Sequence, residues 1–322
     1  MIGPRESAII ASLALVGCGG ASAVVSARQR YEPFTCTSYV GPRVIATIAD
    51  PRLSEVSGLA VSRTHPNVFY VQNDSGEPHA RFFAIDAAGV VLAEHAVGEA
   101  LLAFDLEEIA IGPGRDPAHD AIYLADIGDN DARNGRGGRS AIQVLRVDEP
   151  PAPPRGTPPI TTVLTPVDRF ELRYPEGPID CEAFFVEPDS GDLYLLGKVA
   201  SGPAPIFVAH APLSTTAPNA LVRVGQTLSA RDLGDSITAA SLAPDGVHLA
   251  VRTYRHALLF TRETNEGWAE ALAREPVMLP RLHEPQGEAI AFFDAGGTIL
   301  SITEGESAPI HALDPDCPVT AE

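Results

Sequence analysis

The stretch Asp180-Cys-Glu-Ala-Phe-Phe185 decides the fold, because four related segments align with it along the chain. These segments are Glu55-Val-Ser-Gly-Leu-Ala60, Asp105-Leu-Glu-Glu-Ile-Ala110, Ser236-Ile-Thr-Ala-Ala-Ser241 and Gln286-Gly-Glu-Ala-Ile-Ala291. Their third positions lie 50, 75, 56 and 50 residues apart and are occupied by Ser57, Glu107, Glu182, Thr238 and Glu288. A motif that recurs at such a period indicates a repeat architecture, in which each repeat is one supersecondary unit.

Each segment is followed by a turn and then by further short apolar runs. The turns are rich in Pro, Asp and Gly and suit tight hairpins, as in Pro188-Asp-Ser-Gly191, Pro244-Asp-Gly246 and Asp294-Ala-Gly-Gly297. Four short strands in a period of about 50 to 60 residues predict an all-β fold, a β-propeller of four-stranded blades. We expect five blades; the alternative is a sixth, divergent blade in the long period or in residues 212–236.

The two ends of the repeat array predict how the propeller closes. Residues 44–49 form an apolar run with no repeat of their own, and the fifth repeat ends at Ala312 without a fourth strand. We therefore expect the N-terminal strand to complete the last blade, because such closure removes two exposed sheet edges. This arrangement places Cys36 near Cys317 and predicts a disulfide between them, which leaves Cys181 as a small buried residue. The cysteine count alone allows three pairings.

Polar residues at two positions of every repeat predict a site on one face of the propeller. Inner strands begin, and second strands end, around the same mouth of the central tunnel. Carboxylates two residues apart on a strand share a side. The acids that we expect to hold a metal ion there are Asp105, Glu107, Asp180, Glu182 and Glu288. The second-strand ends add Asp126, Lys198, Arg252 and Glu304 as candidate ligand-binding residues.

Calcium is the ion that this donor set favours. Calcium accepts six to eight hard oxygen ligands in loose geometry, and no Cys/His set with zinc spacing occurs in the chain. The alternative is a hydrated acidic tunnel without a metal, in which the carboxylates are solvated or bonded to backbone amides.

The segment that follows Asp126 carries a second group of candidate residues. It reads Asp126-Ile-Gly-Asp-Asn-Asp-Ala-Arg-Asn-Gly-Arg-Gly-Gly-Arg139. Asp129 and Asn130 offer oxygen ligands, while Arg133 and Arg136, with Arg139, offer planar donors for a carboxylate or a phosphate. Its glycines suggest a mobile lid over the tunnel. The alternative is a solvated hairpin with local Asx turns.

The N-terminus predicts export. Arg5 precedes an apolar run over residues 8–16, too short to span a bilayer, and Leu15-Val-Gly-Cys18 follows. This tetrapeptide resembles the lipobox of bacterial lipoproteins, which implies a signal peptide over residues 1–17 and lipidation of Cys18. We expect a flexible tether over residues 18–42 and a single propeller domain over residues 43–322. Gly19 after the cysteine resembles lipoproteins sent to the outer membrane; the inner membrane is the alternative.

The composition limits the partners. A formal net charge of -19 argues against nucleic acid and against an anionic bilayer surface. We therefore expect membrane contact through the lipid anchor only, a monomer, and a small-molecule, glycan or protein ligand at the top face. No nucleophile elbow, Walker loop or Ser/His/Asp set is present.

At the acidic inner-strand motif, residues 43–315 resemble two groups of propellers. One is the β-propeller phytases and phytase-like proteins, where repeated acids hold calcium ions that bind phosphate. The other is the senescence-marker, gluconolactonase and NHL-repeat group, where a few tunnel carboxylates and an Asn hold one divalent ion. The positions that match are Asp105, Glu107, Asp180, Glu182 and Glu288. Two blades depart from the motif with Ser57 and Thr238, and the lysine-rich phosphate cradle of phytases is absent except for Lys198 and Arg252.

Three functions remain open at this point. The first is a noncatalytic, membrane-anchored binding propeller, the second a metal-dependent hydrolase of a phosphoester or lactone, and the third an assembly scaffold in the cell envelope. We favour binding, because an acidic ring is visible and a general base with a defined partner is not.

Overall fold

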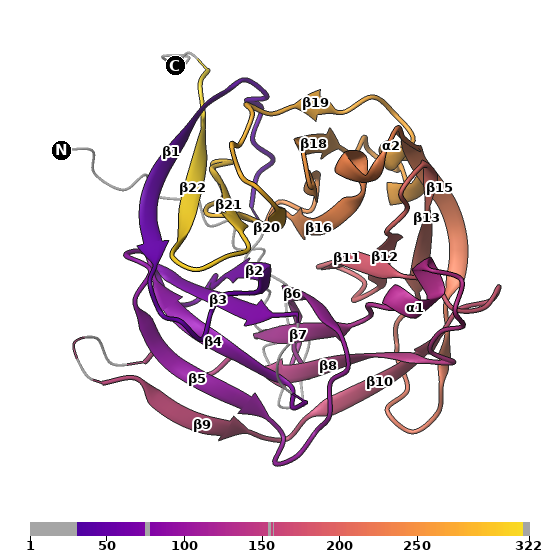
Figure 1. Ribbon diagram of the computed structural model, residues 1–322, viewed down its shortest axis with the longest axis horizontal. Helices are drawn as coiled ribbons and strands as arrows, with labels where there is room; N and C mark the ends of the chain where they lie inside the picture. Colours follow the sequence, from indigo (N-terminus) through magenta and orange to yellow (C-terminus); the bar gives the residue numbers. More distant parts are fainter. Residues whose placement is uncertain (1–30, 75–77, 154–155, 157, 318–322) are drawn as a thin grey trace, which may run out of the picture.

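Five β-sheets surround a central axis in the computed structural model (Figure 1), which describes residues 31–74, 78–153, 156 and 158–317. Blade 1 contains β2 (Val56–Val61), β3 (Val68–Asn73), β4 (Arg81–Asp86) and β5 (Val91–Val97). Blade 2 contains β6 (Leu106–Pro113), β7 (Asp120–Asp126), β8 (Ile142–Asp148) and β10 (Asp168–Arg173). Blade 3 contains β11 (Cys181–Val186), β12 (Leu193–Gly197), β13 (Gly202–Ala209) and β15 (Val222–Ala230).

Blades 4 and 5 complete the ring. Blade 4 contains β16 (Ile237–Leu242), β17 (His248–Thr253), β18 (Ala257–Thr261) and β19 (Val277–Met278). Blade 5 contains β20 (Gly287–Phe292), β21 (Ile299–Thr303), β22 (Ala308–Pro315) and β1 (Tyr39–Ile48). The prediction of an all-β propeller with five blades is confirmed, and the alternative of a sixth blade is wrong.

The two regions suspected of hiding a sixth blade instead add single strands to existing blades. After β8 the chain leaves blade 2, and β9 (Ile160–Leu164) pairs in parallel with β5 at the outer edge of blade 1. The chain then returns to blade 2 as β10. In the second region, β14 (Asn219–Ala220) pairs in parallel with β10. These additions cover the outer edge strands of blades 1 and 2, which reduces their exposure to edge-to-edge association.

The chain closes as predicted, through its first and last strands. β1 pairs antiparallel with β22 from Tyr39 opposite Pro315 to Ile48 opposite Ala308. Cys36 and Cys317 form a disulfide with a Cα–Cα distance of 5.7 Å, and Cys181 is a free, buried cysteine. The ring of Phe34 stacks on His248 at 3.7 Å. The chain therefore contacts the propeller before residue 43, within the segment that we expected to be a tether.

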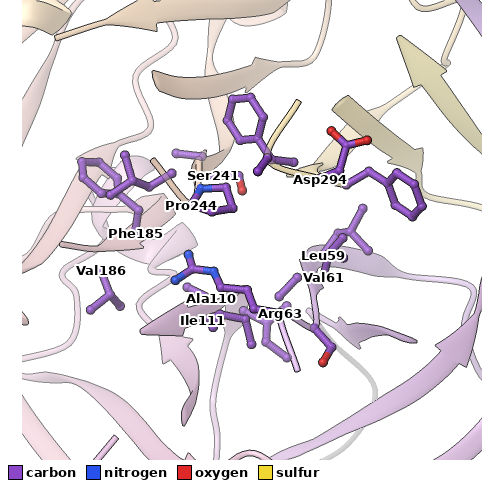
Figure 2. Close-up of a pocket in the computed structure, with 18 of the residues that line it drawn as sticks. Leu59, Val61, Arg63, Ala110, Ile111, Phe185, Val186, Ser241, Pro244 and Asp294 are labelled. Carbon is purple, nitrogen blue, oxygen red and sulfur yellow. The ribbon is translucent and has the colours of Figure 1, made fainter. Parts of the chain in front are cut away.

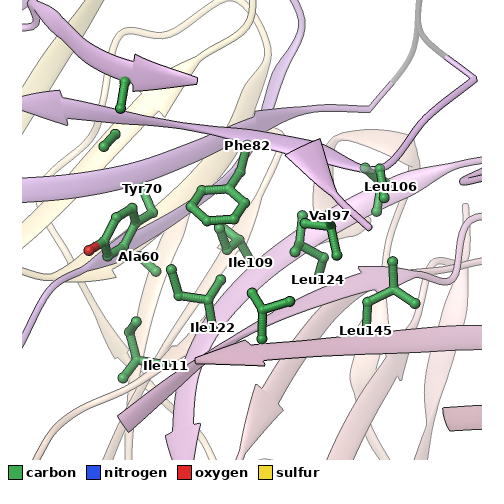
Figure 3. Packing of buried hydrophobic residues seen from close by; sticks show 14 of the residues in the cluster. Ala60, Tyr70, Phe82, Val97, Leu106, Ile109, Ile111, Ile122, Leu124 and Leu145 are labelled. Carbon is green, nitrogen blue, oxygen red and sulfur yellow. The ribbon is translucent and has the colours of Figure 1, made fainter. Parts of the chain in front are cut away.

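Apolar side chains fill the space between adjacent blades. Between blades 1 and 2, for example, Tyr70 and Phe82 pack edge to face at 5.6 Å against Ile109 and Leu124 (Figure 3). Each such side chain stabilises the fold by about 1.5–3 kcal/mol on burial. Because every inner strand is packed in this way, its first residues are held rigidly at the mouth of the tunnel.

A β-bulge occurs at the same motif position in all five inner strands. In blade 1, Val56 pairs with Asn73 and Gly58 with Gln72, so that Ser57 has no partner in the ladder. The same shift occurs in the other four blades and leaves out the third motif position each time: Glu107, Glu182, Thr238 and Glu288. Bulges re-aim side chains and are frequent beside functional sites. The five residues that leave the strand ladder are thus the same five that the repeated motif singled out.

Three short helices lie outside the blades in the part of the chain that the structure describes. α1 (Asn130–Arg133) follows β7, the 3-10 helix η1 (Leu233–Asp235) precedes β16, and α2 (Trp268–Leu272) follows β18. Of these, α1 lies next to the candidate site.

Candidate functional site

Three carboxylates from blades 2 and 3 form a buried cluster, which we call the acidic triad. Glu107 lies at the bulge of β6, Glu182 at the bulge of β11, and Asp180 directly precedes β11. One carboxylate oxygen from each lies within 4.8 Å of the others. The residues are 4%, 5% and 3% exposed for Glu107, Glu182 and Asp180, respectively. Hard oxygen ligands in this arrangement can hold a divalent cation such as calcium.

Lys198, which directly follows β12 in blade 3, neutralises part of the triad. Its ammonium donates to Glu182 Oε1 and, at 2.6 Å, to the hydroxyl of Tyr254. Glu182 Oε2 has no hydrogen-bond partner among the residues that the structure describes. A buried carboxylate oxygen without a partner is costly, and a bound cation is the kind of group that satisfies it.

Burial shifts the acids of this region toward their protonated forms. The pKa values of Glu107 and Glu182 are raised, first because the side chains are desolvated. The same cause raises the pKa of Asp105 to about 6 and that of Glu288 to about 7. Neighbouring carboxylates add to each shift, Asp180 at Asp105 and Asp74 at Glu288. A cation that binds these acids therefore competes with protons up to a higher pH than it would at exposed carboxylates.

Gly128 brings the backbone of the segment after β7 against these carboxylates. A Cβ at this position would lie 2.2 Å from Glu107 Oε1 and 2.5 Å from Asp105 Oδ2. Only glycine fits so close an approach. The segment after Asp126 is therefore shaped to cover the triad.

The hairpin that contains α1 is bonded onto the triad. The amide of Asp129 donates to Asp180 Oδ1 at 2.8 Å, and the Asp129 side chain caps α1 by accepting from Ala132 N. Arg133 approaches Asp180 Oδ2 to 3.2 Å and Glu182 Oε1 to 3.8 Å. Of the other predicted residues, Asn130 and Arg136 are exposed, and Arg136 pairs with Asp131 at 2.8 Å.

Arg139 fits neither the expectation that the arginines of this segment are donors for a ligand nor the alternative of a solvated hairpin. Its guanidinium pairs with Asp126 Oδ1 at 2.7 Å and donates to the carbonyl oxygen of Gly128 at 3.0 Å. Asp126 is fully buried and needs a positive partner there. Asp126 and Arg139 thus anchor the hairpin, and only Arg133 reaches the triad.

We expect Arg139→Gln to lower the free energy of unfolding by about 2 kcal/mol, because a charged hydrogen bond to a buried group is lost. Arg136→Gln, on the same hairpin but exposed, should change it by less than about 0.5 kcal/mol. Thermal unfolding of both variants checks this difference. Equal stability of the two variants would mean that the hairpin is not anchored through Arg139.

A second, more exposed acidic group lies on the same face. Glu55, Asp74 and Glu304 each place a carboxylate oxygen within 4.8 Å of the others. Gln286 bridges this group to Glu288 by donating to Glu288 Oε1 at 3.1 Å and to Glu304 Oε2. The pKa of Glu304 is raised to about 8, by burial first and then by Glu288. Glu288 and Glu304 are thus close to each other, and neither belongs to the acidic triad.

Arg252 lies apart from the triad, although the sequence suggested a ligand-binding role. It is 0% exposed and donates to Glu284 Oε2 at 2.8 Å and to the carbonyl oxygen of Thr253 at 2.6 Å. Glu284 also accepts from Ser301 at 3.0 Å and contacts His311 Nδ1 at 2.7 Å. This ion pair joins blades 4 and 5 inside the protein.

Two residues near the axis were missed by the sequence argument. Tyr254, the partner of Lys198, lies just beyond the end of β17 and outside the aligned motif. Glu108 is fully buried and accepts from the amides of Ile109 at 3.0 Å and Ala240 at 3.1 Å. A signal for Glu108 existed: the other four repeats carry Gly58, Ala183, Ala239 and Ala289 at its position.

The fold and site define a five-bladed β-propeller with a buried acidic cluster at one mouth of its tunnel. No protein-family model matches the chain. A comparison with curated proteins returns no match either.

Solved structures with a related arrangement of the chain do exist. The soluble aldose sugar dehydrogenase from Escherichia coli is 8% identical, with a TM-score of 0.49 over 86% of this chain and 99% of that chain. A glucose dehydrogenase is 10% identical, with a TM-score of 0.39 over 85% and 99%. An auxiliary nutrient binding protein from Bacteroides thetaiotaomicron is 11% identical, with a TM-score of 0.42 over 88% and 75%. At these values the likeness supports no conclusion about this chain.

Proposed function

We propose that this protein is an exported, lipid-anchored binding propeller that holds a divalent cation, calcium by preference, at Glu107, Asp180 and Glu182. The observation that carries the proposal is the acidic triad, whose Glu182 Oε2 lacks a hydrogen-bond partner among the described residues. The cation would satisfy that oxygen and offer its remaining coordination positions to a ligand. Arg133, Lys198 and Tyr254 border the triad and would contact such a ligand.

The anchor part of the proposal rests on Cys18, which lies outside the described residues. The Cys36–Cys317 disulfide supports an extracytoplasmic location, because disulfides persist in oxidising compartments. Within the described part of the chain, no helix is long and apolar enough to cross a membrane. The ligand that we propose is a small molecule, a glycan or a partner protein that reaches the top face of a monomer.

A metal-dependent hydrolase of a phosphoester or lactone is the second candidate. The feature that favours it is the Tyr254 hydroxyl, whose pKa is raised to about 12, by burial first, so that it keeps its proton beside the triad. A bound cation would act as a Lewis acid, and Tyr254 would donate a hydrogen bond to the reacting group. Hydrolysis of a chromogenic phosphoester or lactone that depends on both calcium and Tyr254 would favour this function over binding alone.

Calorimetric titration of the full chain with calcium tests the proposal. We expect one tightly bound ion for each chain at pH 8 and weaker binding at pH 5. Binding should weaken in acid because the pKa values of Asp105, Glu107 and Glu182 are raised, so these acids take up protons at a higher pH than exposed carboxyls do. The bound protons compete with the cation. Absence of binding at pH 8 would contradict the proposal.

A further inference from the structure

A cleft of about 450 Å³ opens beside Tyr254. Tyr254 and Arg255, which follow β17, line it together with residues 281–285, which precede β20. The hydroxyl of Tyr254 also accepts a hydrogen bond from Lys198, and Lys198 donates to Glu182 of the acidic triad. Because Tyr254 borders both features, the cleft adjoins the proposed cation site on the same face of the propeller.

The loop before β20 presents two polar side chains to this cleft. Leu282 is 3% exposed and packs in the apolar core between blades 4 and 5, and the Glu284 carboxylate is bonded inward to Arg252. Arg281 and His283 alternate with these buried residues, are exposed, and line the cleft. The buried side chains fix the loop, so that Arg281 and His283 are held two residues apart on its outer side.

Arg281 and His283 are free to bind a ligand. Neither has a hydrogen-bond or ion-pair partner among the residues that the structure describes. Arg255, by contrast, is already engaged, since its guanidinium pairs with Asp232 at 2.8 Å and with Asp235 at 3.0 Å. The cleft therefore offers an unpaired guanidinium and an unpaired imidazole, in a protein whose formal net charge is -19.

The cavity at the opposite end of the propeller axis does not offer the same chemistry. It has a volume of about 190 Å³, and Figure 2 shows Arg63 extending among its walls. Arg63, however, already interacts with another group of the protein. The cleft beside Tyr254 is therefore the better site for a negatively charged ligand.

The donors of the cleft select an oxyanion. A guanidinium pairs with a carboxylate or a phosphate through two parallel, charge-assisted hydrogen bonds, and an imidazole N–H adds a further donor. We infer that the cleft binds an oxyanion, a carboxylate or a phosphate, at Arg281 and His283. The inference deepens the proposed function and rests on it in one respect, because the rest of the ligand would extend past Tyr254 to the cation. The oxyanion itself is held by the protein and does not require the cation.

Titration of the full chain with malonate and with inorganic phosphate tests the inference, followed by ligand-observed NMR. The buffer is freed of metal ions with a chelating resin, because a soluble chelator is itself a polycarboxylate. Malonamide serves as the uncharged analogue of malonate. We expect at least one of the two anions to bind once per chain, and the tighter of them identifies the oxyanion that is recognised. Malonamide should bind about tenfold or more weakly than malonate, because charge-assisted hydrogen bonds are lost.

Variants of the loop locate the bound anion. Arg281→Gln should weaken the tighter anion about tenfold, and Arg281→Lys should restore only part of the affinity, because it keeps the charge but lacks the planar fork. His283→Ala, which removes a further donor, should weaken binding as well. Both side chains are exposed, so these variants should fold as wild type does. Arg173→Gln is the matched control, since it removes an exposed arginine from β10 of blade 2 and should leave the affinity unchanged.

Three results would overturn the inference. They are absence of binding of both anions to wild type, an Arg281→Gln protein that binds as tightly as wild type, and an Arg173→Gln protein that is weakened as much as Arg281→Gln. A separate calcium titration distinguishes this inference from the cation proposal. A chain that binds an anion but no calcium contradicts only the cation site, and a chain that binds calcium but neither anion contradicts only the cleft.

Discussion

Replacing Glu284 with glutamine is expected to lower the free energy of unfolding by about 3–5 kcal/mol, the usual cost of removing one partner of a buried ion pair. Arg252 and Glu284 are both fully buried, with side-chain exposures of 0%. The variant keeps the shape of the side chain but leaves the Arg252 guanidinium without a counter-charge. A Cβ on Gly287 would lie 1.9 Å from Arg252 Nη2, so the guanidinium is packed too tightly to turn toward solvent.

The effect of Glu284→Gln should also depend on pH. Burial alone would raise the pKa of Glu284, but the hydrogen bond from His311 and the charge of Arg252 outweigh it and lower the pKa. A lowered carboxyl pKa contributes stability above the unfolded value near 4.5 that is lost as the pH falls. The difference in the free energy of unfolding between wild type and Glu284→Gln should therefore become smaller at low pH.

Chemical denaturation at several pH values measures this prediction. Glu306→Gln is the matched control, because Glu306 is exposed and should change stability by less than about 0.5 kcal/mol. A double variant, Arg252→Met with Glu284→Leu, should recover most of the loss, since no buried charge is left alone. A Glu284→Gln protein as stable as wild type at pH 7 would show that the pair does not hold blades 4 and 5 together.

Loss of the Cys36–Cys317 disulfide is expected to lower the stability by up to about 5 kcal/mol, because the bond closes a loop that contains nearly the whole propeller. The two cysteines are 281 residues apart in the sequence. The variant that tests this is Cys36→Ser with Cys317→Ser, and its stability is compared with that of wild type by denaturant unfolding. It supplies its own control: a reducing agent should destabilise wild type and leave the variant unchanged. Equal stability of the two proteins under oxidising conditions would contradict the account of closure.

The repeat made the architecture predictable. An aligned motif at each inner strand, together with a leftover strand at the N-terminus, was enough to expect five blades, closure by β1 and the Cys36–Cys317 bond. The bulges were not predictable in this way, since a periodic apolar pattern reports which face is buried and not which residue leaves the ladder.

The site was predictable only in outline. The motif singled out Glu107, Asp180 and Glu182, but it could not separate Lys198, which reaches the triad, from Arg252, which does not. Both residues follow the same second-strand pattern. Arg252 pairs instead with Glu284, which lies outside the motif. Gly287 leaves room for its guanidinium. At that position the other repeats carry larger residues: Val56, Leu106, Cys181 and Ile237.

The roles of the charged residues after Asp126 depend on contacts that the sequence pattern does not show. Asp129 and Arg133 reach Asp180, about fifty residues away, while Arg139 turns back to Asp126. Composition showed the charges of this segment, but only the fold shows which of them are already used.

The central claim is that the acidic triad holds a cation, and thermal unfolding of wild type and Glu107→Gln in excess calcium and in chelator tests it most directly. Glu107 is the suitable position, because replacing Glu182 would leave the buried ammonium of Lys198 without its carboxylate. Glu55→Gln, in the exposed acidic group, serves as the control.

We expect calcium to raise the melting temperature of wild type and of Glu55→Gln at pH 8, since an ion that binds the native state stabilises it by RT ln(1 + [L]/Kd). Glu107→Gln should lose most of this increase. If the acids only repel one another in water, Glu107→Gln should be at least as stable as wild type in both solutions. That result, with no calcium-dependent shift in either protein, would contradict a cation site at the triad.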